Sequence, residues 1–378
     1  PRPGRHGGLR PAAAVQPGAA AQDGSGVSEG LVIKQEANFY TVALADQVYL
    51  CSMRANIKKA GEQIKVGDRV LLDEIEAERP VIDEVLPRTS ELDKPAVANV
   101  DQVLIVMSCL QPDFNFLLVD RLLLAVLYES LTPVLCISKC DLVDQDFEEY
   151  IAQEYAEFDL YFISSATGRG LDGLVEALAG RVTVLAGPSG AGKSSLINRL
   201  NPDIQLVVGD VNQLGIGKHT TRHVSLHRIG NGWVADSPGF NNMQLPPIEP
   251  GDLSSYYPEF QPFLGGCGFS DCEHSHEPDC AVKTGLGLDD ADSERYYNYL
   301  RIFEELREST RERTDAGKEE ALTKRAVGKN RQDQVLKLGT AGRARSRRTH
   351  RQIIEQVSHW IEVSEDNLED IDPEEWRI

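Results

Sequence analysis

"VTVLAGPSGAGKSSLINRL", residues 182–200, joins an apolar run to a helical pattern through a glycine-rich loop. The loop "GPSGAGKSS" matches G-x-x-x-x-G-K-[ST], and a position between a strand and a helix is the context that this phosphate-binding motif requires. Backbone N–H groups of such a loop surround phosphate oxygens, Lys193 can reach the β- and γ-phosphates, and Ser194 can bind Mg²⁺. We therefore predict nucleotide contacts along the whole loop, from Gly187, Pro188, Ser189, Gly190, Ala191, Gly192, Lys193, Ser194 and Ser195.

Two segments downstream of this loop complete its chemistry. "DSPGF" starts at the end of an apolar run, where Asp236 can hold Mg²⁺ through water and the N–H of Gly239 can meet the γ-phosphate. Between the two lies "GIGKHTTRHV" (215–224), which is either a polar surface loop or the segment that offers a hydroxyl to Mg²⁺. Both Thr220 and Thr221 are candidates for that hydroxyl.

The water-positioning residue is not the usual one. Phe240 follows Gly239, where many GTPases have a glutamine that orients the attacking water. His219 is the nearest polar substitute, because an imidazole can position water or accept its proton. Otherwise His219 is a solvated loop residue, and hydrolysis without a partner would be very slow.

A second motif, "SKCD" (138–141), lies upstream of the phosphate loop at the end of another apolar run. It resembles the Asn-Lys-x-Asp sequence with which GTP-binding domains hold guanine, with Ser138 in place of Asn. Asp141 can accept hydrogen bonds from guanine N1–H and N2–H₂, a donor pattern that adenine lacks, and Lys139 can lie over the base. We predict base contacts from Ser138, Lys139, Cys140 and Asp141, although a hydroxyl cannot make both contacts of an Asn amide.

The order of the motifs predicts a circular permutation. "SSATGRG" (164–170) follows the next apolar run and resembles the Ser-Ala element that contacts guanine O6, here through Ser165 and Ala166. In ordinary GTPases both base-binding elements come after the phosphate loop, whereas here both precede it in their correct mutual order. Permutation is feasible because the termini of a domain usually lie close together on its surface.

The surrounding patterns divide the chain into domains. Residues 31–90 hold short β runs broken by turns, typical of a small barrel such as an OB-fold. Residues 96–247 alternate strands with helices, which predicts a doubly wound α/β sheet that carries the permuted GTPase motifs. Residues 250–320 bear cysteines and histidines and then become helical. The predicted fold is therefore multidomain, with extensions at 1–30 and 321–378.

A metal site is predicted in "CGFSDCEHSHEPDC" (267–280). Three thiolates and one imidazole suit a closed, tetrahedral structural Zn²⁺ site. Residue chemistry leaves His274 and His276 equally possible as the fourth ligand. The ligands would be Cys267, Cys272, Cys280 and one of these histidines.

The extensions and the charge leave alternatives open. The net charge is −20, but residues 321–351 carry ten Lys or Arg and one acidic residue, while residues 352–378 carry nine acidic residues and one Arg. The basic stretch is either a solvated tail or a segment that binds the phosphate backbone of a nucleic acid. Residues 1–30, rich in Ala, Gly and Pro, are either a disordered extension or the remnant of a transit peptide. The second alternative favours a plastid over a bacterial cytoplasm. The apolar runs are too short or too interrupted to predict a membrane span.

Together these motifs resemble the RsgA (YjeQ) family of circularly permuted GTPases, which assist maturation of the small ribosomal subunit. The resemblance covers about residues 31–310 and includes "VGDRV", "ANVDQVLIV", "VDR", "SKCD", "SSATGRGL", "GPSGAGKSSLIN", "GKHTTRHV", "DSPGF" and the Cys/His spacing. It implies an OB-fold, a permuted GTPase domain and a zinc domain, with GTP or GDP, Mg²⁺ and one Zn²⁺ bound. It also implies that His274 is the zinc ligand, that His219 positions water, that the small subunit and its rRNA are the partners, and that the small subunit stimulates hydrolysis.

Three functions therefore remain to be weighed. The first is a GTPase of the plastid or of a bacterial cytoplasm, monomeric and without membrane contact, that binds the small subunit and leaves it after hydrolysis. The second is a nucleotide-gated RNA-binding or ribosome-binding module with little turnover, which Phe240 and Ser138 favour. The third is an ATP-using P-loop enzyme, which only Asp141 and "SSA" oppose.

Overall fold

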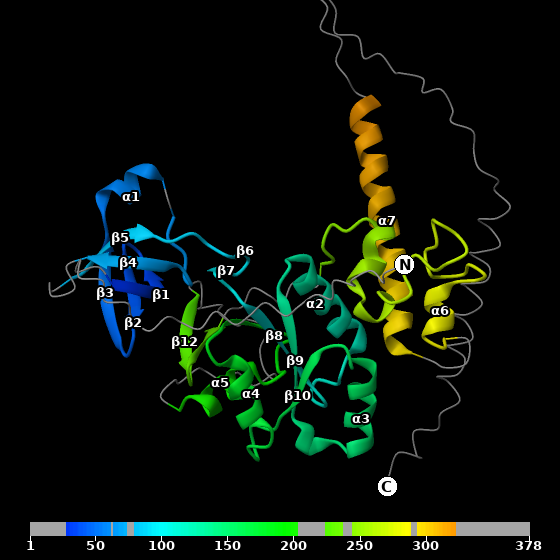
Figure 1. Cartoon of the computed structure of the whole chain (residues 1–378), viewed down its shortest axis with the longest axis horizontal. Coiled ribbons are helices and arrows are strands. Elements are labelled where there is room, and N and C mark those ends of the chain that lie inside the picture. Colours follow the sequence, from blue (N-terminus) through cyan, green and yellow to red (C-terminus); the bar gives the residue numbers. More distant parts are fainter. Residues whose placement is uncertain are drawn as a thin grey trace, which may run out of the picture. The chain divides into compact units, whose positions relative to one another are not determined.

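The computed structural model describes most of the chain between its two ends. The described residues are 28–61, 63–73, 79–202, 224–236, 244–288 and 293–322. The chain divides into two compact units, Pro1–Thr310 and Arg311–Ile378. In the second unit only residues 311–322 are described, as the continuation of a helix. Figure 1 gives the element labels.

The first domain is a closed five-stranded barrel, which confirms the predicted OB-like fold. Its strands pair in the order β1-β2-β3-β5-β4, and a further β1–β4 pairing closes the ring. Alternate side chains point inward, because successive residues of a strand face opposite sides. The strands are β1 (Ser28–Glu36), β2 (Phe39–Leu44), β3 (Gln47–Met53), β4 (Arg69–Asp73) and β5 (Val81–Val85), and a short helix that the sequence pattern did not indicate, α1 (Ala55–Ala60), follows β3.

The second domain is a mostly parallel sheet covered by helices on both faces, as predicted. Its strand order is β10-β9-β8-β11-β13-β12, with only β12 antiparallel to its neighbour. The strands are β8 (Gln102–Ser108), β9 (Thr132–Ser138), β10 (Asp159–Phe162), β11 (Val182–Ala186), β12 (Ser225–Ile229) and β13 (Gly232–Asp236). The helices are α2 (Phe116–Tyr128), α3 (Gln145–Glu154), α4 (Leu171–Leu178) and α5 (Lys193–Leu200).

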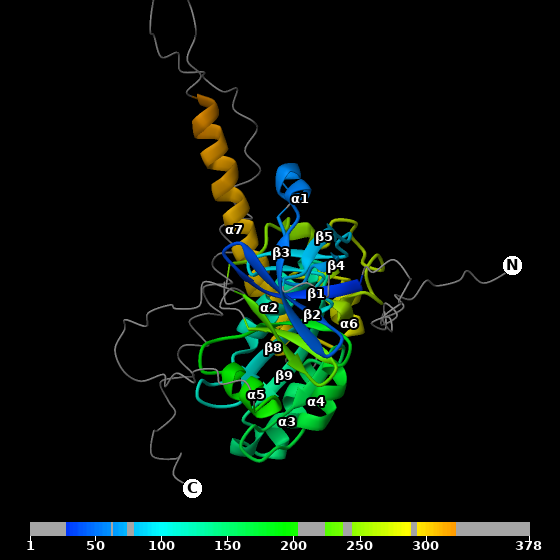
Figure 2. The ribbon, with the colours of Figure 1, turned by 90° about the vertical axis from the view of Figure 1, so that its left-hand side faces the viewer.

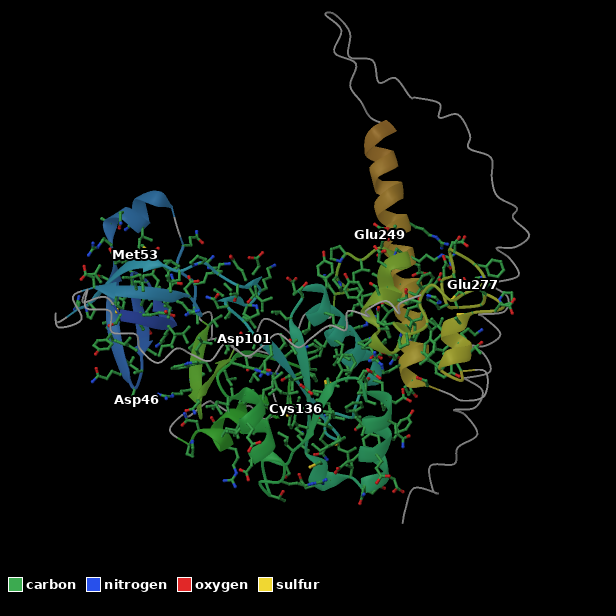
Figure 3. All side chains as sticks on the ribbon, in the orientation of Figure 1. Asp46, Met53, Asp101, Cys136, Glu249 and Glu277 are labelled. Atoms are coloured by element: carbon green, nitrogen blue, oxygen red, sulfur yellow. The ribbon has the colours of Figure 1, made fainter. Side chains whose placement is uncertain are left out.

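Alternation along β8 builds two hydrophobic cores, one on each face of this sheet. Val103, Ile105 and Met107 belong to the core shared with α2 and α3, whereas Leu104 and Val106 belong to the core shared with α4 and α5. Every residue of β8 is buried, as expected for a central parallel strand. Figure 3 places Cys136 of β9 inside this domain, where its side chain is fully buried.

The barrel and the GTPase sheet are joined edge to edge. Lys34 of β1 pairs with Ser225 of β12, so the strands of both domains form one 11-stranded sheet. Arg228 of β12 also donates to the Asp46 carboxylate in the β2–β3 turn, at 2.8 Å. Figures 1 and 2 both show β12 beside the barrel strands. A hairpin of β6 (Glu91–Asp93) and β7 (Ala96–Ala98) forms the covalent link.

The third domain packs 3₁₀ turns and two helices against α2. Its elements are η3 (Pro250–Tyr256), η4 (Pro258–Phe260), α6 (Ala281–Gly285) and α7 (Glu294–Leu322). Its core contains Phe260, Tyr299 and Ile302 together with Leu124 from α2. None of the helices in the described part of the chain is long and apolar enough to cross a membrane.

Candidate functional site

Three loops predicted from the sequence meet at one edge of the GTPase sheet. They follow the carboxyl ends of β9, β10 and β11, which run parallel to one another and to β8. Ligands of open α/β sheets bind at this edge. The chain order of these strands, base-binding loops first and phosphate loop last, is the permuted order that the motifs predicted.

The phosphate loop has the backbone that its glycines allow. Gly187, Gly190 and Gly192 have φ values of 125°, 82° and 94°, in the region that favours glycine. At Gly187 a Cβ would lie 2.0 Å from the carbonyl oxygen of Val106, so no other residue fits there. Helix α5 then begins without a side-chain cap, which leaves its first N–H groups directed at the loop.

Lys193 lies over this loop, as its predicted role requires. Its ammonium donates to the carbonyl oxygens of Gly187 and Pro188, at 2.6 and 2.7 Å. These contacts hold the positive charge where the loop wraps a phosphate, so a bound phosphate oxygen would compete with both carbonyls for it. Ser194 and Ser195 follow in the first turn of α5 and are half-buried.

Ser138 explains how the first base-binding loop is joined to the phosphate loop. It is the last residue of β9 and is 4% exposed. Its hydroxyl donates to the carbonyl oxygen of Ala191 at 2.6 Å. The hydroxyl is therefore directed at the phosphate loop and joins the end of β9 to that loop.

Ser138→Ala is expected to weaken GDP binding about fivefold, because a buried hydrogen bond contributes ~1 kcal/mol and the Ala191 carbonyl would lose its donor. Ser108→Ala is the matched control. Ser108 pairs with Ser138 in the β8–β9 register, is equally buried, and donates to Pro112 at 2.6 Å, away from the phosphate loop. Titration of a fluorescent GDP analogue measures both variants. Equal affinities for the two variants would contradict this role of Ser138.

Lys139, Cys140 and Asp141 form the rest of the first base-binding loop. Lys139 adopts a left-handed conformation (φ 59°), and its ammonium donates to the carbonyl of Gln111 in the loop after β8. Cys140 is buried, and burial raises the pKa of its thiol, so it is a neutral packing residue under the loop. Asp141 lies in the short turn η1 (Cys140–Leu142) and is exposed, so its carboxylate is accessible to a ligand.

The second base-binding loop adjoins the first. The N–H of Cys140 donates to the carbonyl of Ile163 at 3.2 Å, directly before the loop. Within the loop, Ser164 accepts from the N–H of Thr167 with its hydroxyl and from the N–H of Gly168 with its carbonyl. This compact turn leaves Ser165 half-buried and Ala166 exposed, at its outer end.

The remaining predicted nucleotide residues are only partly placed. Asp236 is the last residue of β13, next to β11 in the sheet, which brings it to the same edge as the phosphate loop. His219, Thr220, Thr221 and Gly239 lie outside the described residues.

The four predicted zinc ligands come together in the third domain. The sulfurs of Cys267, Cys272 and Cys280 lie 3.6, 3.5 and 3.5 Å from Nδ1 of His274. A tetrahedral zinc with bonds of about 2.3 Å to sulfur and about 2.0–2.1 Å to nitrogen requires this separation, close to ~3.6 Å. The residues therefore fit one structural Zn²⁺, with His274 as ligand. His276 instead contacts the hydroxyl of Ser275, in an exposed position.

Neighbouring groups hold the metal loop in shape. Glu277, which Figure 3 labels at the edge of this domain, accepts from the N–H groups of Glu273 and Ser275 at 2.8 and 2.9 Å. Burial raises the pKa of this carboxyl, but these hydrogen bonds outweigh burial and lower it overall. Burial also lowers the pKa of His274, which favours the neutral imidazole that a metal needs. No sequence pattern indicated this role of Glu277, because only the folded loop brings its carboxylate back to these N–H groups.

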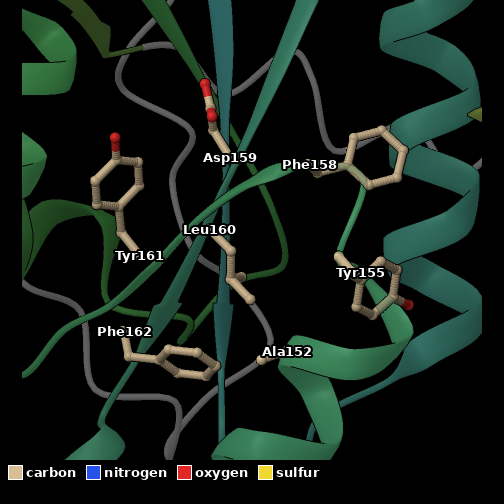
Figure 4. Close-up of a pocket in the computed structure, with 8 residues that line it drawn as sticks. Ala152, Tyr155, Phe158, Asp159, Leu160, Tyr161 and Phe162 are labelled. Atoms are coloured by element: carbon tan, nitrogen blue, oxygen red, sulfur yellow. The ribbon is translucent and has the colours of Figure 1, made fainter.

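A separate cavity of about 530 Å³ lies beside α3 and β10. Its lining includes Tyr155, Phe158, Leu160 and Phe162 together with Asp159 (Figure 4). None of the predicted nucleotide-binding residues lines this cavity. It is therefore not the nucleotide site.

Comparison with known families identifies two parts of the chain. Residues 29–82 match the RsgA N-terminal domain, and residues 85–246 match the RsgA GTPase. A protein of Geobacillus thermodenitrificans named small ribosomal subunit biogenesis GTPase RsgA is 42% identical over 287 residues, which cover 74% of this chain and 98% of that protein.

Two solved structures are similar to this chain. YjeQ from Thermotoga maritima is 34% identical, with a TM-score of 0.63, over 74% of this chain and 98% of that one. YloQ, described as a circularly permuted GTPase, is 31% identical, also with a TM-score of 0.63, over 77% of this chain and 99% of that one. The permuted order is therefore shared with a solved structure.

Proposed function

Because this chain belongs to the RsgA family of GTPases, we propose that it binds the small ribosomal subunit and couples GTP hydrolysis to a late maturation step and to its own release. The meeting of the phosphate loop with both base-binding loops at one sheet edge carries this proposal. The subunit as partner comes from the relatives, which are named for its biogenesis.

Residues of the described loops have distinct tasks in this proposal. The backbone of residues 187–192 and the ammonium of Lys193 bind the phosphates of GTP, and Asp141 selects guanine. Ser194, Asp236 and one of Thr220 and Thr221 would hold Mg²⁺, which neutralises charge on the β- and γ-phosphates when it is bound. His219 would orient the attacking water in place of the missing glutamine.

Binding of the subunit would involve the barrel, because small barrels of this type commonly bind oligonucleotides. β12 directly follows the segment that contains Thr220 and Thr221, and the same strand pairs with β1 of the barrel. If the conformation of the segment with Thr220 and Thr221 changes with the bound nucleotide, the change would therefore reach the barrel through β12 alone. This connection supports coupling between hydrolysis and release.

The decisive experiment measures hydrolysis of GTP and ATP with and without purified small ribosomal subunits. We expect slow turnover of GTP alone, strong stimulation by subunits, and no comparable reaction of ATP. Tight GTP binding without turnover in either condition would establish the alternative of a nucleotide-gated binding module.

In the same assay His219→Ala should remove most of the stimulated rate of GTP hydrolysis while leaving GDP affinity unchanged. A wild-type rate would refute the role of His219.

The compartment is a separate proposal. The relatives named above come from bacteria. We propose a plastid location only from the Ala- and Arg-bearing composition of residues 1–30. Fusion of these residues to a fluorescent protein tests it in plant cells, and a diffuse cytosolic signal would refute it.

A further inference from the structure

An ion pair joins the second base-binding loop to the helix that follows the first. Arg169 donates through Nη1 and Nη2 to the two carboxylate oxygens of Glu148, both at 2.7 Å. The Glu148 side chain is 9% exposed and that of Arg169 is 55% exposed. A bidentate pair of this geometry fixes orientation as well as distance, since two parallel hydrogen bonds lock both planes together.

Glu148 is rigidly connected to the loop of Asp141. Helix α3 starts at Gln145, only four residues after Asp141, and Asp144 caps it by accepting from the N–H of Phe147 at 3.0 Å. Glu148 lies in the first turn of this helix. A displacement of Glu148 therefore accompanies any displacement of the loop that would select guanine.

Arg169 is connected in the same way to the loop of Ala166. Its carbonyl accepts from the N–H of Ser164 at 3.0 Å, which closes the turn that holds Ser165 and Ala166. At its far end the loop packs closely on β10, since a Cβ at Gly170 would lie 2.1 Å from the carbonyl oxygen of Phe162. The side chain of Arg169 thus links the second base-binding loop to the helix that directly follows the first.

We propose that Arg169 and Glu148 are positioning residues for guanine recognition. The pair sets the separation between the Asp141 carboxylate, which meets N1–H and N2–H₂, and the Ala166 backbone, which meets O6 of the same base. This inference rests on the proposed GTPase function and adds two residues to it. Neither residue touches the base itself.

The test compares the binding of GDP with that of ADP, because only guanine can make the contacts that the pair of Arg169 and Glu148 aligns. We expect Arg169→Ala to weaken binding of a fluorescent GDP analogue about tenfold and to leave the weak binding of the ADP analogue unchanged. The preference for GDP over ADP should fall by the same factor. Glu148→Gln should give a smaller loss in the same direction, and Arg169→Lys should lie between wild type and Arg169→Ala. The kcat for GTP at saturation should stay at the wild-type value.

Arg54→Ala is the matched control, since Arg54 forms a half-exposed pair with Asp73 in the barrel, far along the chain from the base-binding loops. Thermal unfolding verifies that each variant is folded. Folded Arg169→Ala and Glu148→Gln proteins with wild-type GDP affinity would overturn the proposal, and so would equal losses for GDP and ADP. A wild-type chain that shows no preference for GDP would instead refute guanine recognition as such, and the proposed function with it.

Discussion

Cys272→Ser is expected to abolish zinc binding and to unfold the domain between residues 250 and 310. Residues 261–280 contain no helix or strand, so only scattered hydrogen bonds, such as those of Glu277, would hold their backbone without the metal. The ligand Cys280 is itself part of the domain core, next to Phe260 and Tyr299. In zinc-finger peptides a structural zinc contributes about 10–16 kcal/mol, more than the stability of most domains of this size.

Metal analysis and near-ultraviolet circular dichroism measure this outcome, because Tyr257 and Tyr299 in the domain core report its packing. Wild-type protein should contain one zinc per chain and Cys272→Ser none. Cys51→Ala is the control: Cys51 is buried in the barrel core and belongs to no metal cluster. The control should keep its zinc and its tyrosine signal. A Cys272→Ser protein with one zinc and an unchanged signal would show that the cluster is not the metal site.

The parts of the fold that local patterns encode were predicted correctly. Alternating or continuous apolar runs predicted the barrel strands and the buried strand β8, and motif order alone predicted the permutation. The same holds for the zinc ligands, whose spacing is short enough to read along the chain. Only the choice between His274 and His276 needed the resemblance or the structure, since both are imidazoles within three residues.

Contacts between distant segments could not be predicted in this way. Ser138 and Ala191 are 53 residues apart, and a serine at the end of an apolar strand carries no signal of its partner. In the sequence Glu148 is one of several acidic residues in a polar helix, and its burial and its pairing with Arg169 exist only in the folded chain. The pairing of β12 with β1 of the barrel could not be predicted either, because the composition of a strand does not indicate which strand becomes its neighbour in the sheet.

Asp120→Ala is expected to destabilise the protein by about 3–5 kcal/mol, because it removes the more deeply buried of the two carboxylates that pair with the buried charge of Arg295. Asp120 lies in α2 of the GTPase domain and accepts from Arg295 and Asn298 of α7, both at 2.6 Å. The side chains of Asp120 and Arg295 are 1% and 7% exposed. The remaining partner of Arg295 would be Glu259, which accepts from Nε at 2.6 Å.

Three aromatic rings lie around the guanidinium of Arg295. Its guanidinium carbon lies 5.1, 5.2 and 5.1 Å from the ring centres of Tyr155, Phe158 and Tyr257. These rings attract the cation but exclude water that could otherwise solvate it. Burial raises the pKa of Asp120 to about 7, since loss of hydration outweighs the attraction of Arg295. Unfolding is therefore best measured at about pH 8, where the carboxylate is ionised.

The neighbouring residue provides the control for this prediction. Arg121 also links α2 to α7, through Glu305, but both side chains of that pair are partly exposed, at 21% and 46%. Arg121→Ala should therefore cost at most about 1 kcal/mol, as is usual for exposed ion pairs. Asp120→Asn keeps the shape of the side chain but removes its charge. Its free energy of unfolding in urea should lie between those of Asp120→Ala and Arg121→Ala. If Asp120→Ala and Arg121→Ala lowered the free energy of unfolding by the same small amount, the buried pair would not be the main contact between the zinc domain and the GTPase domain. If the expected order is found, the buried pair of Asp120 and Arg295 contributes more than the exposed pair to the attachment of α7 to α2.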